Sequence, residues 1–152
     1  MIIEQIKTAS LSQIKAKFKT LAPISIAMRQ EFYRASFIGP WWLRHSARPS
    51  IALSGLMGWQ GKKFINTTTA INILKRNSGL IEKLSMNCVE QISLVDGEKG
   101  IVLLYGQNAP LPWRWVVDEL RVLDENTLLC MTTINLPLLR HVSFPFVLSR
   151  DL

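Results

Sequence analysis

The stretch that decides the fold runs from residue 113 to residue 134 and reads WRWVVDELRVL (113–123), DEN (124–126) and TLLCMTTI (127–134). Two runs rich in apolar and β-branched residues are separated by three residues typical of a turn, which predicts a β-hairpin. A strand as long as 113–123 twists rather than lying flat. Because a sheet that curls until it closes has no exposed edges, the pattern favours a barrel or a strongly curved sheet.

The same alternation of strands and short loops continues on both sides of this hairpin. The remaining elements of the pattern are strands at 84–94, 101–105 and 142–148, with turns at 96–100 and 136–137. Strands joined by short loops are antiparallel neighbours in a sheet. We therefore expect a mainly β (α+β) fold whose body is an antiparallel meander sheet or barrel.

The N-terminal third has a helical pattern instead. Apolar residues recur at helical spacing from Leu11 to Leu21, and Pro23 interrupts the pattern, so a second helix is expected from there to Gly39. A short helix is also expected at 70–76, after a glycine-bounded apolar run at 51–57. The expected organisation is a single domain, 1–152, with a basic helical arm (1–50) and a barrel-like body (51–152).

The positive charge is concentrated in the arm. The chain has a formal net charge of +7, and residues 1–50 carry eight basic and two acidic side chains. Such asymmetry indicates an acidic partner or a solvated helix surface. Nucleic acid is disfavoured because the basic residues are not interleaved with a known reading motif.

Trp41 and Trp42 stand beside Arg44, a combination that suits the interface of an anionic membrane. The alternative is that these indoles pack on the core and on the helix, which is the commoner role of tryptophan. If the arm docks on a membrane, we expect Lys15 and Lys19 to contribute with these three residues. The N-terminus lacks the features of a signal peptide, so the protein is expected to be cytoplasmic, with membrane association as an option.

Motifs of catalysis are missing from the sequence. It has no nucleophile elbow, no phosphate-binding loop and no dinucleotide fingerprint, and His45 and His141 are its only histidines. Cys88 and Cys130 lack the spacing of a zinc site, and no cofactor is expected. An enzyme is therefore disfavoured, and its remaining form would use Asp118, Glu119 or His141 as acid or base.

The stretch Trp59-Gln60-Gly61-Lys62-Lys63-Phe64 resembles the opening of the GXWXG-type, lipocalin-like (calycin-like) domains of bacteria. The resemblance extends over roughly residues 51–152, although Met57 stands where the first glycine of that signature belongs. It implies a small barrel in a family of poorly characterised function.

The C-terminal stretch 131–141 is similar to the approach to the haem-ligating histidine of nitrobindin-like barrels. That similarity implies His141 as an axial ligand if the barrel binds haem. Against it, the opening signature lacks a further glycine that nitrobindins have.

Strand alternation places Asp118 and Arg121 on opposite faces, so one of them faces inward if the strand is regular. A buried charge needs a partner, and Lys62 or Arg121 with Asp118 or Glu119 are the candidate pairs. Such a pair either holds a ligand's carboxylate or phosphate head group or is a structural ion pair.

Taken together, these features predict a non-enzymatic protein that holds an apolar or amphipathic, lipid-like molecule in a barrel cavity. The alternatives are a peripheral membrane or protein-docking module and a haem-binding barrel. The candidate ligand-binding residues are Trp59, Lys62, Tyr105, Trp115, Asp118 and Arg121. The oligomeric state is left open.

Overall fold

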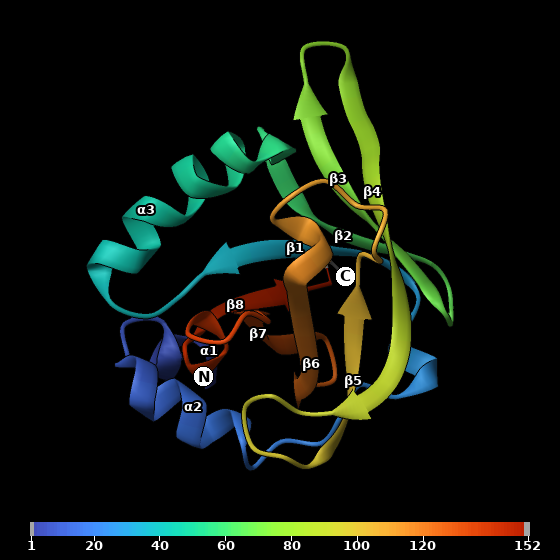
Figure 1. Ribbon diagram of the computed structural model, residues 1–152. Helices are drawn as coiled ribbons and strands as arrows, with labels where there is room; N and C mark the ends of the chain where they lie inside the picture. Colours follow the sequence, from blue (N-terminus) through green and yellow to red (C-terminus); the bar gives the residue numbers. More distant parts are fainter. Residues whose placement is uncertain (1, 151–152) are drawn as a thin grey trace.

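The computed structural model describes residues 2–150, so the predicted domain of 1–152 extends beyond the described part at both ends. Its centre is a closed barrel of eight antiparallel strands in chain order, in which the last strand pairs with the first (Figure 1). The strands are β1 (Glu31–Phe37), β2 (Trp59–Asn66), β3 (Thr69–Arg76), β4 (Gly79–Ile92), β5 (Lys99–Leu104), β6 (Val116–Asp124), β7 (Thr127–Ile134) and β8 (Ser143–Ser149). The mainly β fold class expected from the sequence is confirmed.

The expected second helix of the arm is wrong in its C-terminal half, because residues 31–37 form β1. Tyr33 and Ala35 are buried and alternate with more exposed neighbours, a period of two that fits a strand. β1 lies between β2 and β8 and closes the barrel, so the barrel begins within the predicted arm. What precedes it is a short 3-10 turn, η1 (Ile26–Met28), rather than a helix.

Residues 70–76, expected to be helical, belong to β3. Ala70, Asn72 and Leu74 are buried at alternate positions. Two β-branched residues, Ile71 and Ile73, lie between them, and both favour a strand. Pairing with β2 and β4 on either side outweighs the weak helical periodicity of this short run.

The helix that follows β1 was not expected from the sequence. α3 (Trp41–Ile51) starts directly after Gly39-Pro40, and a π-helical turn, η2 (Ala52–Leu56), continues it. The apolar run 51–57 therefore lies in the last residue of α3, in η2 and in the turn that follows. Figure 1 shows α3 and η2 lying alongside the barrel wall, next to one end of the barrel.

The N-terminal helices, α1 (Ile2–Ile6) and α2 (Leu11–Phe18), pack against the outside of the barrel. Ser10 caps α2 by accepting a hydrogen bond from the Gln13 backbone. Ile14 and Phe18 of α2 are fully buried against outward-facing residues of β6, β7 and β8, such as Leu129 and Val147. The arm is thus part of the packed body, with its lysines on the solvent side.

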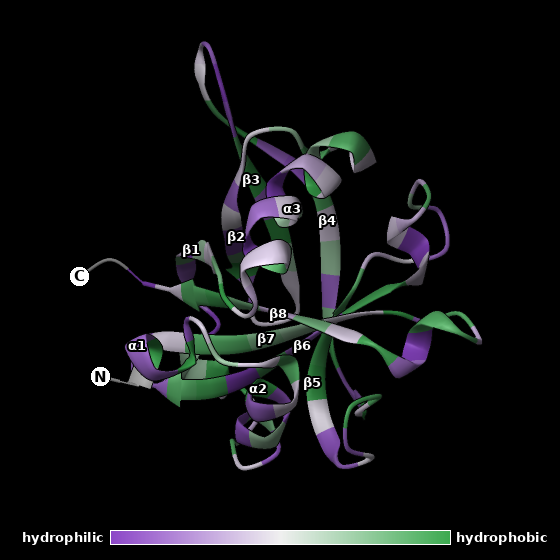
Figure 2. Cartoon of the chain, turned by 90° about the vertical axis from the view of Figure 1, so that its left-hand side faces the viewer, coloured by the Kyte–Doolittle hydropathy of each residue, from purple (hydrophilic) through white to green (hydrophobic). Residues whose placement is uncertain are grey.

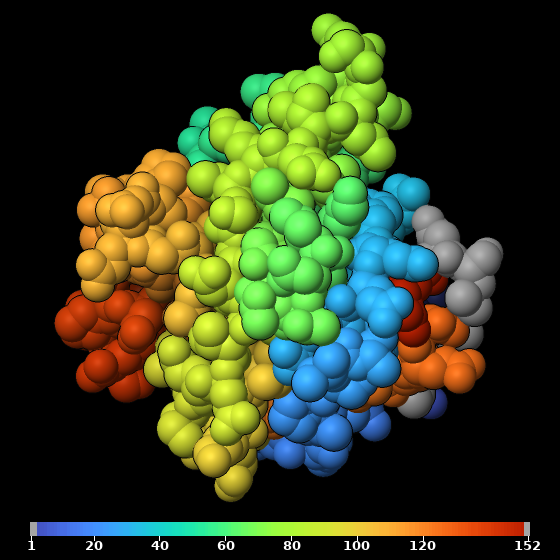
Figure 3. All heavy atoms as spheres, turned by 90° about the vertical axis from the view of Figure 1, so that its right-hand side faces the viewer, coloured from blue at the N-terminus to red at the C-terminus, as the bar shows by residue number. Residues whose placement is uncertain are grey.

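A second, larger core fills the barrel. It includes Tyr33, Leu74, Leu103, Leu120 and Leu148, all of which are fully buried. Figure 2 shows the strands coloured mainly as hydrophobic, with hydrophilic colour in the helices, the loops and the β3–β4 hairpin. That hairpin stands out above the rest of the surface in the space-filling view of Figure 3.

No helix within residues 2–150 combines the length and the apolar character needed to cross a bilayer.

Candidate ligand-binding cavity

A cavity of about 330 Å³ lies between the barrel interior and the helical segment α3–η2. Its walls are mainly aromatic and aliphatic. They include Phe37, Leu56, Trp59, Trp113, Phe144 and Phe146. Trp59 packs edge-on against Phe146, with ring centroids 5.5 Å apart, which gives this wall a fixed shape.

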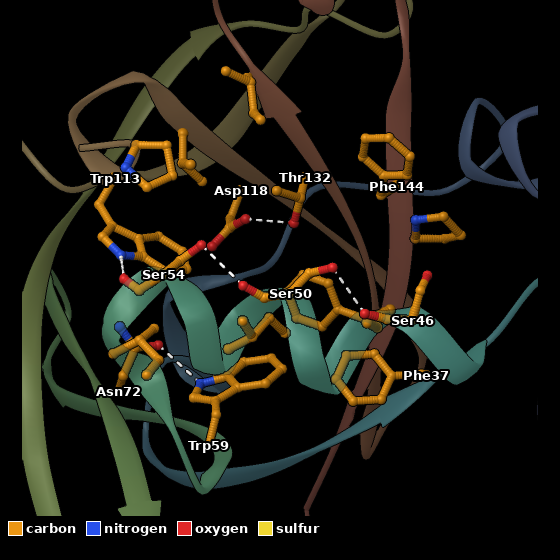
Figure 4. Close-up of a pocket in the computed structure, with 18 of the residues that line it drawn as sticks. Phe37, Ser46, Ser50, Ser54, Trp59, Asn72, Trp113, Asp118, Thr132 and Phe144 are labelled. Atoms are coloured by element: carbon orange, nitrogen blue, oxygen red, sulfur yellow. Dashed lines mark hydrogen bonds between the residues drawn. The ribbon is translucent and has the colours of Figure 1, made fainter. Parts of the chain in front are cut away.

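One side of the cavity is a stripe of serines from α3 and η2. Ser46, Ser50 and Ser54 are spaced four residues apart, so they share one helix face and line the cavity (Figure 4). Ser50 Oγ donates to the Ser46 carbonyl at 2.8 Å, and Ser54 Oγ donates to the Ser50 carbonyl at 2.9 Å. The stripe gives the otherwise apolar cavity a polar flank.

Facing the serines is an ion pair inside the barrel. Lys62 on β2 and Asp118 on β6 approach to 3.0 Å, between Nζ and Oδ2, and both side chains are almost fully buried. Thr132 on β7 donates from Oγ1 to Asp118 Oδ1 at 2.7 Å. Asp118 and Thr132 both line the cavity (Figure 4).

Asn72 and Tyr105 complete this buried polar cluster. Lys62 Nζ donates to Asn72 Oδ1 at 3.0 Å and to the Tyr105 hydroxyl at 3.1 Å. Asn72 Nδ2 also donates to the Tyr105 hydroxyl at 3.1 Å, and Trp59 Nε1 donates to Asn72 Oδ1 at 3.0 Å. The cluster therefore joins β2, β3 and β6 to the segment after β5.

The electrostatics of the cluster keep Lys62 charged. Burial alone would lower the pKa of Lys62, but the adjacent Asp118 carboxylate and Tyr105 raise it above its usual range. Burial also raises the pKa of Tyr105. At neutral pH the cluster thus holds a protonated ammonium and a neutral phenol, and neither provides an unprotonated base or nucleophile.

Four of the six candidate residues from the sequence come together here. Trp59, Lys62, Tyr105 and Asp118 all line the cavity. Trp115 does not: it lies in a short 3-10 turn, η3 (Trp113–Trp115), that precedes β6, and Trp113 is the residue of that turn that faces the cavity. Its placement in the site is therefore corrected.

Arg121 also lies elsewhere. Asp118 faces into the barrel, so strand alternation turns Arg121 to the outside, where it makes a two-pronged ion pair with Asp96 at 2.6 and 2.9 Å. Its Nη1 also donates to the carbonyl of Phe18 at 3.0 Å, which ties α2 to the barrel. Of the candidate pairs, Lys62 with Asp118 is the one that forms, and Arg121 is structural.

His141 does not fit the role of a haem ligand. It ends a short 3-10 turn, η4 (Leu139–His141), is exposed, and is not among the described residues that line the cavity. In the described part of the chain, no three His, Cys, Asp or Glu side chains gather to hold a metal ion. Cys88 and Cys130 are free and buried. The residues around His141 therefore do not form a haem site.

The sequence analysis missed Asn72, Trp113 and the three serines. The four-residue spacing of Ser46, Ser50 and Ser54 indicates that they share a face only if this part of the chain is recognised as a helix. Asn72 stands alone between isoleucines, and a single polar residue in an apolar run is a sign of a buried hydrogen-bonding position. Trp113 donates from Nε1 to the Ser54 carbonyl at 2.6 Å and so links the wall to the serine stripe.

The comparisons with known proteins support the fold alone. No family model and no curated protein matches this chain. A crystal structure of a protein from Thermomonospora curvata is similar over 99% of this chain and 94% of that one, with a TM-score of 0.73 and 15% sequence identity. The eight-stranded barrel with its accompanying helices is thus an arrangement seen in a solved structure.

Proposed function

We propose that this protein binds a small apolar or amphipathic molecule in the cavity between α3 and the barrel interior. The observation that carries this proposal is the make-up of the cavity. A volume of about 330 Å³ falls within the range of about 300–1,000 Å³ found for small-molecule sites. An aromatic wall facing a few convergent polar groups is also typical of such sites.

The barrel type supports the same proposal. A barrel of eight strands is just wide enough to be filled by side chains or to hold one small ligand. Here buried side chains such as Leu120, Leu128 and Leu148 fill part of the interior, and the cavity lies next to α3 and η2. The lipocalin-like resemblance of residues 51–152 implies a small barrel of the same kind.

The test is a fluorescence titration with N-phenyl-1-naphthylamine, a small neutral probe that brightens in apolar surroundings. We expect saturable binding of one probe per chain. Ser50→Phe, which places a ring in the cavity, should reduce the affinity at least tenfold. Leu53→Phe is the matched control, because Leu53 is 91% exposed on the neighbouring turn and does not line the cavity. Equal affinity of the two variants would refute the cavity as the site.

A second candidate function, docking to an anionic membrane, is favoured by the rim of the cavity. Trp41 and Trp42 at the start of α3 are 69% and 47% exposed. Three segments, 39–58, 106–115 and 135–142, contain or directly follow residues that line the cavity, and we call them the rim segments. They contain four arginines and no Asp or Glu. Exposed indoles and aliphatic side chains beside arginines suit the headgroup region of an anionic bilayer.

Vesicle binding distinguishes docking through the rim segments from docking through the lysines of α2. Lys15 and Lys19 lie on α2 and at its C-terminal end, outside the three rim segments, so the rim proposal does not need them. In co-sedimentation with phosphatidylcholine–phosphatidylglycerol vesicles, Trp41→Ala should weaken binding more than Lys15→Ala combined with Lys19→Ala. The opposite order would assign docking to α2. Absent sedimentation would remove the membrane as a partner, and salt-insensitive sedimentation would mean that charge does not drive the binding.

A further inference from the structure

Nearly all of the side-chain donors around the cavity are already used within the protein. Thr132 donates to Asp118, and Ser50 and Ser54 donate to carbonyls of their own helix. The Trp113 indole donates to the Ser54 carbonyl and the Trp59 indole to Asn72. Ser46 donates to the Leu43 carbonyl over a longer distance, 3.4 Å, and Trp42 lies at the exposed mouth.

Lys62, the cation of the site, also makes all of its hydrogen bonds within the protein. The three protons of an ammonium group match the three oxygen acceptors around Lys62 Nζ, which belong to Asp118, Asn72 and Tyr105. Its charge is balanced by the Asp118 carboxylate at 3.0 Å. A ligand carboxylate or phosphate would therefore meet no unpaired positive charge at the floor of the cavity, and it would face Asp118.

The side-chain oxygen atoms around the cavity can still accept hydrogen bonds. Each oxygen of Asp118 accepts one hydrogen bond from the protein, whereas a carboxylate oxygen has two lone pairs. The hydroxyl oxygens of Ser50, Ser54 and Thr132 use their protons on protein acceptors and keep lone pairs for a ligand. The floor of the cavity thus presents mainly acceptors.

Tyr105 is the exception. Its hydroxyl oxygen accepts hydrogen bonds from Lys62 and Asn72, and both of these groups can only donate. The phenolic proton therefore has no acceptor among the described contacts of Tyr105, a residue that lines the cavity. The inner site combines several acceptors with one available donor.

We propose that the bound molecule presents a hydroxyl group to Asp118, Thr132 and Tyr105, and not a carboxylate or a phosphate. This inference rests on the proposed ligand-binding function. A hydroxyl group can donate to Asp118 or Thr132 and accept from Tyr105 at the same time. A protonated amine would bring a second positive charge next to Lys62, and an ether or ester has no proton to donate. The ligand class is therefore a small apolar alcohol.

The experiment is displacement of bound N-phenyl-1-naphthylamine by molecules of matched length: 1-decanol, decanoate, decylammonium and 1-methoxynonane. We expect 1-decanol to displace the probe at a concentration about tenfold or more below the other three, because each leaves a charge or an acceptor without a partner. Decanoate or decylammonium acting at an equal or lower concentration would overturn the proposal. Equal displacement by 1-methoxynonane would also overturn it.

A variant of Thr132 tests whether this residue contributes to the preference for an alcohol. Thr132→Val removes the hydroxyl oxygen but keeps the shape of the side chain, so the advantage of 1-decanol over 1-methoxynonane should fall several-fold. Thr69→Val, on β3 outside the cavity, is the matched control and should leave that ratio unchanged. If Thr132→Val does not fold, the wild-type series decides. Absence of any probe binding by the wild-type protein would refute the proposed function itself, a different result from a wrong order of ligands.

Discussion

Lys62 and Asp118 form an ion pair across the interior of the barrel, with Nζ and Oδ2 3.0 Å apart. β2 and β6, which carry them, are separated by three strands in either direction around the closed sheet. Lys62 also holds Asn72 and Tyr105, so this one ammonium group organises the floor of the cavity. The pair is thus both a structural bridge and the wall of the candidate site.

Removal of Lys62 should therefore be costly. Lys62→Met leaves Asp118 buried without its partner, and we expect a loss of about 3–5 kcal/mol in the free energy of unfolding. Lys63→Met is the control, since Lys63 pairs with Glu82 on the surface and should change stability by about 1 kcal/mol or less. Urea unfolding measures both. Equal, small losses would mean that the buried pair contributes nothing beyond a surface pair.

Trp59 joins the polar cluster to the aromatic wall. Trp59→Ala removes a side chain that is 7% exposed and should destabilise the protein by about 3–5 kcal/mol. Trp59→Phe keeps most of the packing and loses the hydrogen bond to Asn72, so its loss should be smaller. Trp41→Ala, at an exposed position, should change thermal stability little. A fully stable Trp59→Ala variant would contradict the placement of Trp59 in the core.

The barrel from β4 to β8 could be predicted from the sequence because its strands alternate and its turns are short. The errors at β1 and β3 have a common cause. A short apolar run has no decisive period of its own, and pairing with strands distant in sequence settles its conformation. β1 pairs with β8, more than 100 residues away, and no local pattern around residues 31–37 indicates that contact.

Part of the candidate site could be predicted, because a single charged residue in an apolar strand needs a partner. That reasoning led to Lys62 and Asp118, and strand alternation correctly separated Asp118 from Arg121. It could not decide which of these two faces inward, because that depends on the partner of Arg121. The partner, Asp96, lies in a turn that has no visible link to β6 in the sequence.

Gly61 lies where β2 approaches the backbone of β1 closely. A Cβ atom at this position would lie 2.0 Å from the carbonyl oxygen of Tyr33, so a side chain requires the two strands to separate. Gly61→Ala should destabilise the protein by about 3 kcal/mol, at the upper end for overpacking. At Gly100 the atoms nearest to an added methyl group would be 4.0 Å away, and Gly100→Ala should be nearly neutral. Thermal unfolding of both variants checks this difference, and a Gly61→Ala variant as stable as Gly100→Ala would contradict it.

The ion pair between Asp96 and Arg121 should make the free energy of unfolding depend on pH in the acid range. The hydrogen bonds from Arg121 hold the pKa of Asp96 at about 2, below its ordinary value of 3.8. Because the pKa is lower in the folded state, the pair stabilises the fold above about pH 4, and this contribution is lost as pH falls toward 2. A pKa shift from 3.8 to about 2 corresponds to at most about 2.5 kcal/mol of stability at neutral pH.

Asp96→Asn is the variant that isolates this contribution. It should lower the free energy of unfolding by about 2 kcal/mol at pH 7, and its difference from the wild type should shrink between pH 4 and pH 2. Nearby Glu119 acts in the opposite direction, since burial raises its pKa and its protonation in acid favours the fold. Glu119 is present in both proteins, so the effect of its burial, the largest influence on its pKa, cancels in the comparison, and the repulsion from Asp96 is a smaller contribution. Glu90→Gln, in an exposed pair with Lys99, is the control and should show no such pH dependence. A difference between Asp96→Asn and the wild type that stays constant from pH 7 to pH 2 would show that Asp96 does not owe its role to its charge.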